Sequence, residues 1–151
     1  MILDKKDIHD LIPHRSPFLF IDQCEIIENG THGKGSRIFH KDEFFFLGHF
    51  PNMPIVPGVI LIEALAQTAG IVVSKKYEEY KDKSVLFMSI SKAKFRKPVF
   101  PNDEISFKVN YVNKVKSVYK FFGIALNKKA QKVCEAEFSA MITDKLGKEI
   151  F

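Results

Sequence analysis

The chain of 151 residues contains no tryptophan, only two cysteines and no segment long and apolar enough to cross a bilayer. Cys24 and Cys134 form no Cys-x-x-Cys pair, so the sequence predicts neither a disulfide framework nor a zinc site. The longest apolar stretch, Val59 to Val73, is too short for a span and is interrupted by polar residues. The first ten residues mix acids and lysines, which is typical of neither signal nor transit peptides. We therefore expect a soluble, cytoplasmic protein.

Internal repeats, low-complexity tracts and linkers are also lacking, which predicts a single domain over residues 1–151. A hydrophobic content of 46% supports one core of useful size. The net charge of +5 is compatible with an acidic partner, although such a balance usually serves solubility. The only support for a nucleic-acid-binding function is this charge together with the fifteen phenylalanines, and the sequence contains no recognisable nucleic-acid-binding motif.

The pattern of histidines and glycines excludes several kinds of site. His9, His14, His32 and His40 show no metal-ligand spacing, and no helical His-Glu-x-x-His arrangement exists. Gly33-Lys34-Gly35 lacks the length of a phosphate-binding loop. Nothing in the sequence resembles a nucleophile elbow. We therefore expect no metal, no bound nucleotide and no serine or cysteine nucleophile.

Hydrophobic periodicity predicts a short helix over Asp4–Ile12 and one long helix over Pro57–Tyr77, the latter apolar on nearly all sides and hence buried. Asn29-Gly30 is a strong hairpin signal. Strands are predicted over Phe18–Glu28, Lys34–His40, Val85–Phe95, Ile105–Tyr111, Val118–Leu126 and Cys134–Ile142. Short turns between most of them favour antiparallel pairing. The predicted class is α+β, with about six strands wrapped around one central helix.

The most informative segment is Gly48–Gln67, GHFPNMPIVPGVILIEALAQ. Three prolines, at positions 51, 54 and 57, exclude regular helix or central strand and fix His49 in a rigid loop before the long helix. Pro57 occupies a position that suits a helix start. A lone histidine is more often structural, but this setting favours a general base.

Glu63 is the one carboxylate on the apolar part of the long helix. A buried carboxyl is costly unless it is paired or neutral, and burial raises its pKa, which suits a general acid. The alternative is a structural carboxyl that joins helix and loop, and Gln67, one turn later, fits either role. Gly58 leaves the helix N-terminus open to a substrate oxygen, although plain turn chemistry explains a glycine there equally well.

A basic stripe is predicted in the second half of the chain. Lys92, Lys94 and Arg96 alternate along a predicted strand with Lys97 beside them, so they would share one face. A solvated strand face is the usual explanation of such a run, and an acidic partner is the alternative.

These segments resemble a known family. Pro13-His14-Arg15, the GHFPNMPIVPGV segment with EALAQ, and the later KFRKPV and PND segments are similar to the (3R)-hydroxyacyl-[acyl-carrier-protein] dehydratases of type II fatty acid synthesis. The resemblance covers most of the chain and implies the hot-dog fold, a central helix wrapped by an antiparallel sheet. The glutamate at position 63 resembles the dehydratase-only branch, because the related dehydratase-isomerases have aspartate there.

The resemblance implies roles for single residues. His49 and Glu63 match the catalytic pair, and Gly58 matches the amide donor to the thioester carbonyl. The substrate-binding set further comprises Phe50, Pro57, Val59 and Phe87, of which Phe87 is similar to an aromatic residue that gates the acyl tunnel. Lys92, Lys94, Arg96 and Lys97 would meet the acidic acyl carrier protein.

The resemblance also implies partners and chemistry. The substrate is carried on the phosphopantetheine arm of acyl carrier protein, and dehydration to the trans-2-enoyl thioester needs no cofactor. Two subunits of a homodimer share each active site, and such dimers commonly assemble as trimers of dimers. A hot-dog thioesterase is one alternative, and a non-catalytic acyl-thioester-binding module is another. The released product and measurable turnover distinguish them.

Overall fold

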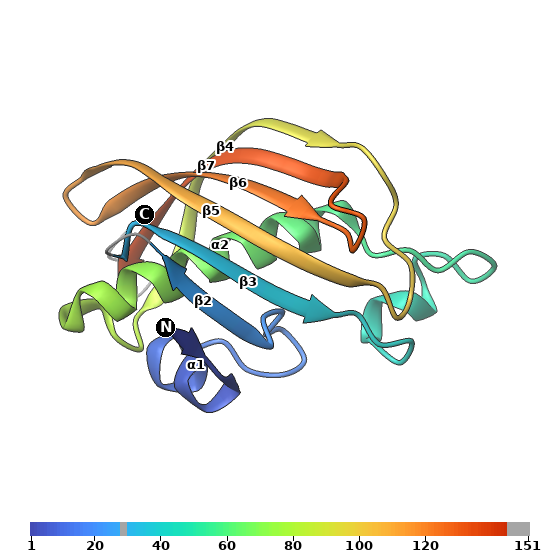
Figure 1. Cartoon of the computed structure of the whole chain (residues 1–151), viewed down its shortest axis with the longest axis horizontal. Helices are drawn as coiled ribbons and strands as arrows, with labels where there is room; N and C mark the ends of the chain where they lie inside the picture. Colours follow the sequence, from blue (N-terminus) through green and yellow to red (C-terminus); the bar gives the residue numbers. More distant parts are fainter. Residues whose placement is uncertain (28–29, 145–151) are drawn as a thin grey trace.

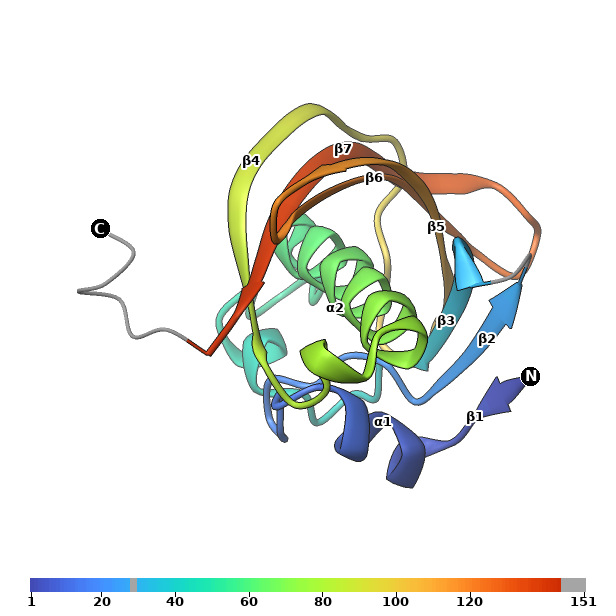
Figure 2. The same ribbon diagram turned by 90° about the vertical axis from the view of Figure 1, so that its left-hand side faces the viewer.

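The computed structural model describes residues 1–27 and 30–144, in which a curved antiparallel sheet wraps one long helix. The helix, α2 (Gly58–Lys76), crosses the concave side of the sheet (Figure 1). Viewed along α2, the sheet curls around the helix, and a short helix, α1 (Lys5–Leu11), packs against α2 on the open side (Figure 2). This is the α+β hot-dog arrangement that the sequence predicts.

Within the described residues, seven strands form the sheet in the order β1-β2-β3-β5-β6-β7-β4, and all neighbours are antiparallel. Their bounds are β1 Ile2–Leu3, β2 Gln23–Ile27, β3 His32–Ile38, β4 Ser84–Phe95, β5 Glu104–Val115, β6 Val118–Leu126 and β7 Lys132–Thr143. Two 3-10 turns, η2 (Phe44–Leu47) and η3 (Glu78–Tyr80), flank the two ends of α2 in the chain. Six strands overlap the six predicted segments, with differences in their bounds, and the two-residue β1 was not expected.

The close contact between sheet and helix depends on glycines in β3. A Cβ atom at Gly33 would lie 2.4 Å from a methyl carbon of Val72, and one at Gly35 would lie 2.6 Å from Thr68 Oγ1. Both neighbours belong to α2, so only glycine lets β3 approach the helix this closely. The Gly33-Lys34-Gly35 segment therefore serves packing.

The predicted strand at Phe18–Glu28 is wrong in its first half, because regular pairing begins only at Gln23. Leu19, Phe20 and Ile21 are all buried in succession, whereas a strand on one sheet face would bury every second residue. The amide of Phe20 donates to the side chain of Gln67 instead of to a strand partner. The segment is thus a buried loop held by α2. The hairpin residue Asn29 lies outside the described residues, and β2 and β3 pair as the hairpin requires.

The expectation that no segment is long and apolar enough for a membrane span is wrong for α2: within residues 1–27 and 30–144 it is the one helix with the length and composition of a span, and 78% of its apolar window is buried inside the molecule. The helix begins after Pro57, which occupies the N-cap position, and Lys75 and Lys76 lie in its last turn. These cations suit the negative end of the helix dipole.

Candidate active site

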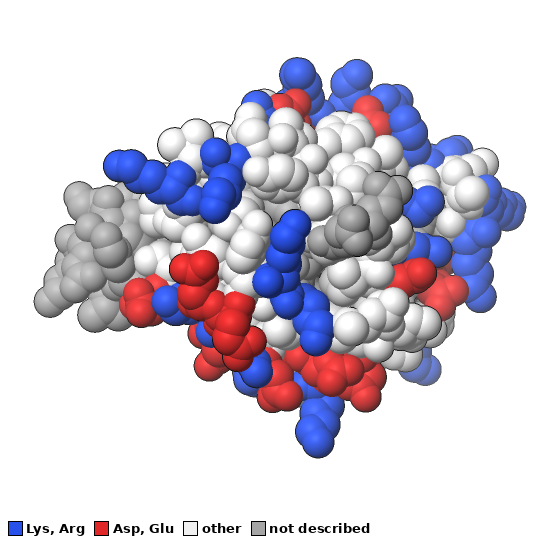
Figure 3. All heavy atoms as spheres, turned by 60° about the vertical axis from the view of Figure 1, so that its left-hand side comes forward, with Lys and Arg blue, Asp and Glu red and all other residues white. Residues whose placement is uncertain are grey.

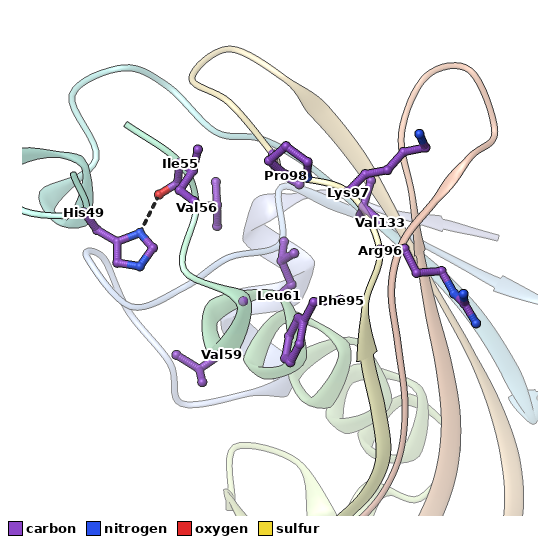
Figure 4. Close-up of a pocket in the computed structure, with 12 residues that line it drawn as sticks. His49, Ile55, Val56, Val59, Leu61, Phe95, Arg96, Lys97, Pro98 and Val133 are labelled. Carbon is purple, nitrogen blue, oxygen red and sulfur yellow. Dashed lines mark hydrogen bonds between the residues drawn. The ribbon is translucent and has the colours of Figure 1, made fainter. Parts of the chain in front are cut away.

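A cavity of about 410 Å³ lies between the N-terminus of α2, the preceding loop and the end of β4 (Figure 4). Its lining consists of His49, Ile55, Val56, Gly58, Val59, Leu61, Phe95, Arg96, Lys97, Pro98, Val99 and Val133. His49 enters from the loop side, while Phe95 faces it from the strand side with α2 between them. The cavity lining is mainly apolar, and its polar residues are His49, Arg96 and Lys97.

The proline-rich loop is held by backbone hydrogen bonds at both of its ends. The amide of Ile55 donates to the carbonyl of His49 at 2.9 Å, and the amide of Val56 donates to the carbonyl of Val99 at 2.8 Å. Phe50 and Met53 exchange amide-to-carbonyl hydrogen bonds of 3.1 and 3.0 Å inside the loop. The loop thus fixes the position of His49, as the proline spacing predicts.

The tautomer of His49 follows from its partner. Nδ1 lies 3.0 Å from the carbonyl oxygen of Ile55, and a carbonyl oxygen only accepts hydrogen bonds. Nδ1 must therefore carry the hydrogen, which leaves Nε2 of the neutral ring with a lone pair. The ring also stacks on Phe50, with centroids 4.1 Å apart. This histidine is oriented to accept a proton at Nε2.

The start of α2 forms the floor of the cavity. The first amides of a helix have no intrahelical acceptor, so Gly58 and Val59 can present N–H groups to an incoming oxygen. A Cβ atom at position 58 would lie 2.5 Å from the ring of Phe95, which packs directly on this glycine. Gly58 is therefore required by packing as well as suited to binding an oxyanion.

Glu63 lies further along α2, in a mostly buried position. Gln67 Nε2 donates to its Oε1 at 3.1 Å, and Nε2 of His14 lies 3.7 Å from the same oxygen. Burial raises the pKa of the Glu63 carboxyl, and the hydrogen bond from Gln67 offsets this only in part. The group is therefore suited to hold a proton and donate it.

Within the described residues of one chain, the carboxyl of Glu63 does not belong to the lining of the cavity that contains the His49 imidazole. His49 lines the cavity at the helix start, whereas Glu63 is absent from that lining and faces the segment that follows α1. The position of His14 beside Glu63 was not anticipated from the sequence. In the sequence, His14 is notable only as part of the Pro13-His14-Arg15 segment, and that segment assigns it no role.

The predicted basic stripe is interrupted. A register irregularity separates Ser91 from Lys94, and Lys92 has a positive φ of 54°, so strict alternation along β4 is lost. Lys92 lies 3.3 Å from Glu137, which also pairs with Lys120 on β6. On the face shown in Figure 3, cationic and acidic side chains are mixed, with an acidic group along the lower side.

Three further residues predicted for substrate binding or docking, Arg96, Lys97 and Phe87, lie away from His49 or outside the cavity lining. Arg96 Nη2 donates to Glu135 Oε1 at 2.8 Å, and this hydrogen bond is the main cause that lowers the pKa of Glu135. Arg96 and Lys97 point away from His49 (Figure 4). Phe87 packs edge-on against Phe138, with centroids 6.0 Å apart, and is not part of the cavity lining. Within residues 1–27 and 30–144, His, Cys, Asp and Glu side chains form no group of three that could hold a metal ion.

Comparison with known sequences identifies a family model, described as a FabA-like domain, that matches residues 12–137. A 3-hydroxyacyl-[acyl-carrier-protein] dehydratase FabZ of Caulobacter sp. (strain K31) is 42% identical over 144 residues, which cover 94% of this chain and 87% of the relative. The corresponding dehydratase of Sulfurovum sp. (strain NBC37-1) is 38% identical over 154 residues, with 96% of this chain and 100% of the relative covered.

Comparison with solved structures supports the fold. The dehydratase heterocomplex ApeI:P from Xenorhabdus doucetiae superimposes with a TM-score of 0.75 at 14% identity, covering 91% of each chain. A hypothetical thioesterase protein with coenzyme A from Streptococcus pneumoniae TIGR4 gives a TM-score of 0.59 at 17% identity, covering 80% of this chain and 85% of that chain. At such low identity these structures establish a shared architecture.

Proposed function

Because the chain belongs to the FabA-like family, we propose that it is a 3-hydroxyacyl-[acyl-carrier-protein] dehydratase in which His49 is the base and Glu63 the acid. It removes water from a (3R)-3-hydroxyacyl thioester in fatty acid elongation and yields the trans-2-enoyl thioester. The observation that carries the residue assignment is the contact between His49 Nδ1 and the Ile55 carbonyl, because it directs a basic Nε2 into the cavity.

Elimination begins at the carbon next to the thioester. An amide at the start of α2, that of Gly58, binds the thioester oxygen and stabilises the negative charge that develops there. Nε2 of His49 then takes the α-proton. The electron pair of the broken C–H bond forms the new double bond as the C–O bond at C3 breaks.

Glu63 completes the reaction at the 3-hydroxyl. Its carboxyl gives a proton to the departing oxygen, so that water leaves in place of hydroxide. After release, the imidazolium of His49 loses its proton and Glu63 regains one, through solvent. The reaction transfers no electrons, so we propose that no redox cofactor takes part, and the phosphopantetheine arm belongs to the substrate.

We further propose that the working unit is a homodimer in which His49 of one subunit acts with Glu63 of the other. One chain does not place the two residues in one cavity, which supports a shared site. β4 is an edge strand whose residues from Met88 to Phe95 are exposed, including the apolar side chains of Ile90 and Phe95. An exposed edge of this kind favours pairing with a second strand. A trimer of such dimers remains part of this proposal.

The substrate-binding set belongs to the same proposal. Pro57 and Val59 flank the helix start, and Phe50 stacks on the base, so all three lie where the thioester arm would enter. Phe87 lies on β4, the edge strand proposed to pair with the second subunit. Its proposed role in gating the acyl tunnel therefore depends on formation of the dimer. Acyl carrier protein is the acidic partner, and Lys94 and Lys97 are the cations proposed to contact it, with Lys92 and Arg96 beside them. We also propose a cytoplasmic location, because α2 packs inside the protein.

The direct test is to incubate the protein with 3-hydroxybutyryl or crotonyl thioesters and to follow the ultraviolet absorbance of the enoyl thioester. Interconversion of the two thioesters is the expected result. Release of free acid would identify a thioesterase, and binding without turnover would identify a non-catalytic module. Either outcome would refute the dehydratase proposal.

A further inference from the structure

A third titratable side chain, His14, lies against the proposed acid. Its Nε2 is 3.7 Å from Oε1 of Glu63, and the side chains are only 13% and 20% exposed. His14 follows α1, and Arg15 holds this turn by donating to the carbonyls of Ile12, His14 and His9 at 2.9, 2.7 and 3.0 Å. The imidazole is therefore placed by a well-anchored turn.

The orientation of the Gln67 amide is determined by the backbone around it. The N–H of Phe20 can only donate, so the atom of Gln67 that lies 2.8 Å from it must be the side-chain oxygen. The NH₂ group then faces the other way, where it donates to the carbonyl of Phe18 at 3.0 Å and to Glu63 Oε1 at 3.1 Å. Oε1 of Glu63 is thus an acceptor.

The tautomer of His14 follows from its other nitrogen. Nδ1 is buried and has no hydrogen-bond partner within the described part of the chain. A buried N–H without an acceptor is costlier than a bare lone pair, so the hydrogen belongs on Nε2. The carboxyl oxygen that this nitrogen approaches is Oε1 of Glu63. At 3.7 Å this approach is an electrostatic contact in the single chain, and such contacts commonly shorten when substrate binds.

Both neighbours therefore direct N–H groups at one oxygen of the carboxyl. An oxygen that receives two donors is the carbonyl oxygen of a protonated acid, and the hydrogen resides on the other one. We propose that His14 is a positioning residue that acts with Gln67 to make Oε1 of Glu63 the acceptor and Oε2 the oxygen that carries the transferable proton. This inference rests on the proposed function.

The charge of His14 is consistent with this role. Burial lowers the pKa of His14, and the neighbouring charge of Arg15 acts in the same direction. Within the described residues, the charged or titratable groups that face it are Glu63 from α2 and Arg15 from its own turn. A neutral imidazole can orient the Glu63 carboxyl through its N–H group without adding a charge. An imidazolium would lower the pKa of the carboxyl and so favour loss of the proton that Glu63 must deliver.

The test compares His14→Ala with His14→Gln, which retains an N–H donor of similar reach. We expect His14→Ala to lower kcat about tenfold, the equivalent of one lost hydrogen bond, with KM changed by less than about twofold. His14→Gln should recover most of the rate. In a Glu63→Gln background, which leaves a measurable residual rate, the His14→Ala change should cost nothing further, because its effect passes through the acid.

The matched control is His9→Ala, a nearby histidine in α1 that should leave kcat unchanged. A wild-type protein without dehydratase activity would refute the proposed function itself. An active wild type with an equally active His14→Ala variant would overturn only the positioning role. The same conclusion would follow if His14→Gln were as slow as His14→Ala, or if the losses multiplied in the Glu63→Gln background.

Discussion

Nδ1 of His49 lies 3.0 Å from the carbonyl oxygen of Ile55, a residue six positions later in the same proline-rich loop. The amide of Ile55 in turn donates to the carbonyl of His49 at 2.9 Å. This reciprocal pair closes the loop on itself and selects the imidazole tautomer in one step. In the sequence this segment is notable only for its unusual spacing of prolines. In the structure it holds the His49 ring so that the lone pair of Nε2 is available to the cavity.

Replacing His49 should therefore abolish catalysis while leaving the fold intact. For His49→Ala we expect kcat/KM to fall by about 10² to 10⁴, the usual contribution of a general base. The ring is only partly buried, so the thermal midpoint should change little. Steady-state kinetics with a crotonyl thioester measures the first effect and calorimetry the second. His40→Ala, at an exposed histidine near the same loop, should behave like wild type; equal loss in both variants would refute the assignment.

Replacing Glu63 by glutamine should lower kcat/KM by about 10² to 10⁴, to a small residual rate, and increase stability at neutral to alkaline pH. Burial raises the pKa of Glu63, so the folded state binds the proton more tightly than the unfolded state. Folding stability therefore falls as pH rises from the unfolded pKa through the folded pKa, and the cost is complete above both. The amide of the glutamine variant cannot ionise and escapes this cost. Denaturant unfolding from pH 4 to pH 8 should show the advantage of Glu63→Gln growing with pH, and a constant difference would contradict it.

Much of this arrangement follows from local sequence pattern, and the exceptions have physical causes. α2 is predictable because a long apolar run leaves no polar face, and β6 is predicted with the observed bounds because it is a run of β-prone residues that ends at a turn signal. The loop at Leu19–Ile21 resembles a strand in composition, yet a side chain from α2 supplies its backbone partner. His14 and Glu63 meet only through tertiary packing between segments 49 residues apart, which no local pattern encodes. The proposed site shared between two subunits follows from no local pattern either.

The packing of Phe95 on Gly58 predicts the effect of a single methyl group. In Gly58→Ala the added Cβ would lie 2.5 Å from the ring of Phe95, so the ring must move away from the helix start. We expect a loss of about 1–3 kcal/mol in stability from overpacking, and a larger loss of kcat/KM because the oxyanion position is obstructed. Chemical denaturation and kinetics report the two effects.

A second substitution at Phe95 separates these effects. Phe95→Leu in the Gly58→Ala background should recover stability, because the smaller side chain makes room for the methyl group. It should recover less of the activity, since the methyl still covers the amide. Full recovery of both would show that the glycine serves packing alone.

Lys94 is a cleaner probe of carrier-protein docking than Arg96. Reversing Arg96 would also place two like charges beside each other, because it pairs with Glu135 at 2.8 Å. For Lys94→Glu we expect KM for acyl carrier protein substrates to rise roughly threefold to tenfold at low salt, with less effect at high salt. KM for a small thioester analogue should not change. Lys75→Glu, at the far end of α2, is the matched control, and equal effects on both substrates would exclude docking at Lys94.

Mixing two strongly impaired variants tests directly whether the site is shared between subunits. In a heterodimer of His49→Ala with Glu63→Gln, one site receives both defects and the other receives an intact His49 and an intact Glu63. Random assortment makes about half of the dimers mixed, each with one working site, so co-expression should restore about a quarter of the wild-type rate per subunit.

If each site belonged to a single chain, every site in the mixture would carry one defect and the rate would stay near zero. The control is a mixture prepared without subunit exchange, which should remain inactive under either arrangement. One chain holds His49 at the start of α2 and turns Glu63 toward His14, so recovery of activity is the outcome that the proposed shared site predicts. Persistent inactivity in dimers shown by mass spectrometry to be mixed would instead require base and acid to meet within one subunit.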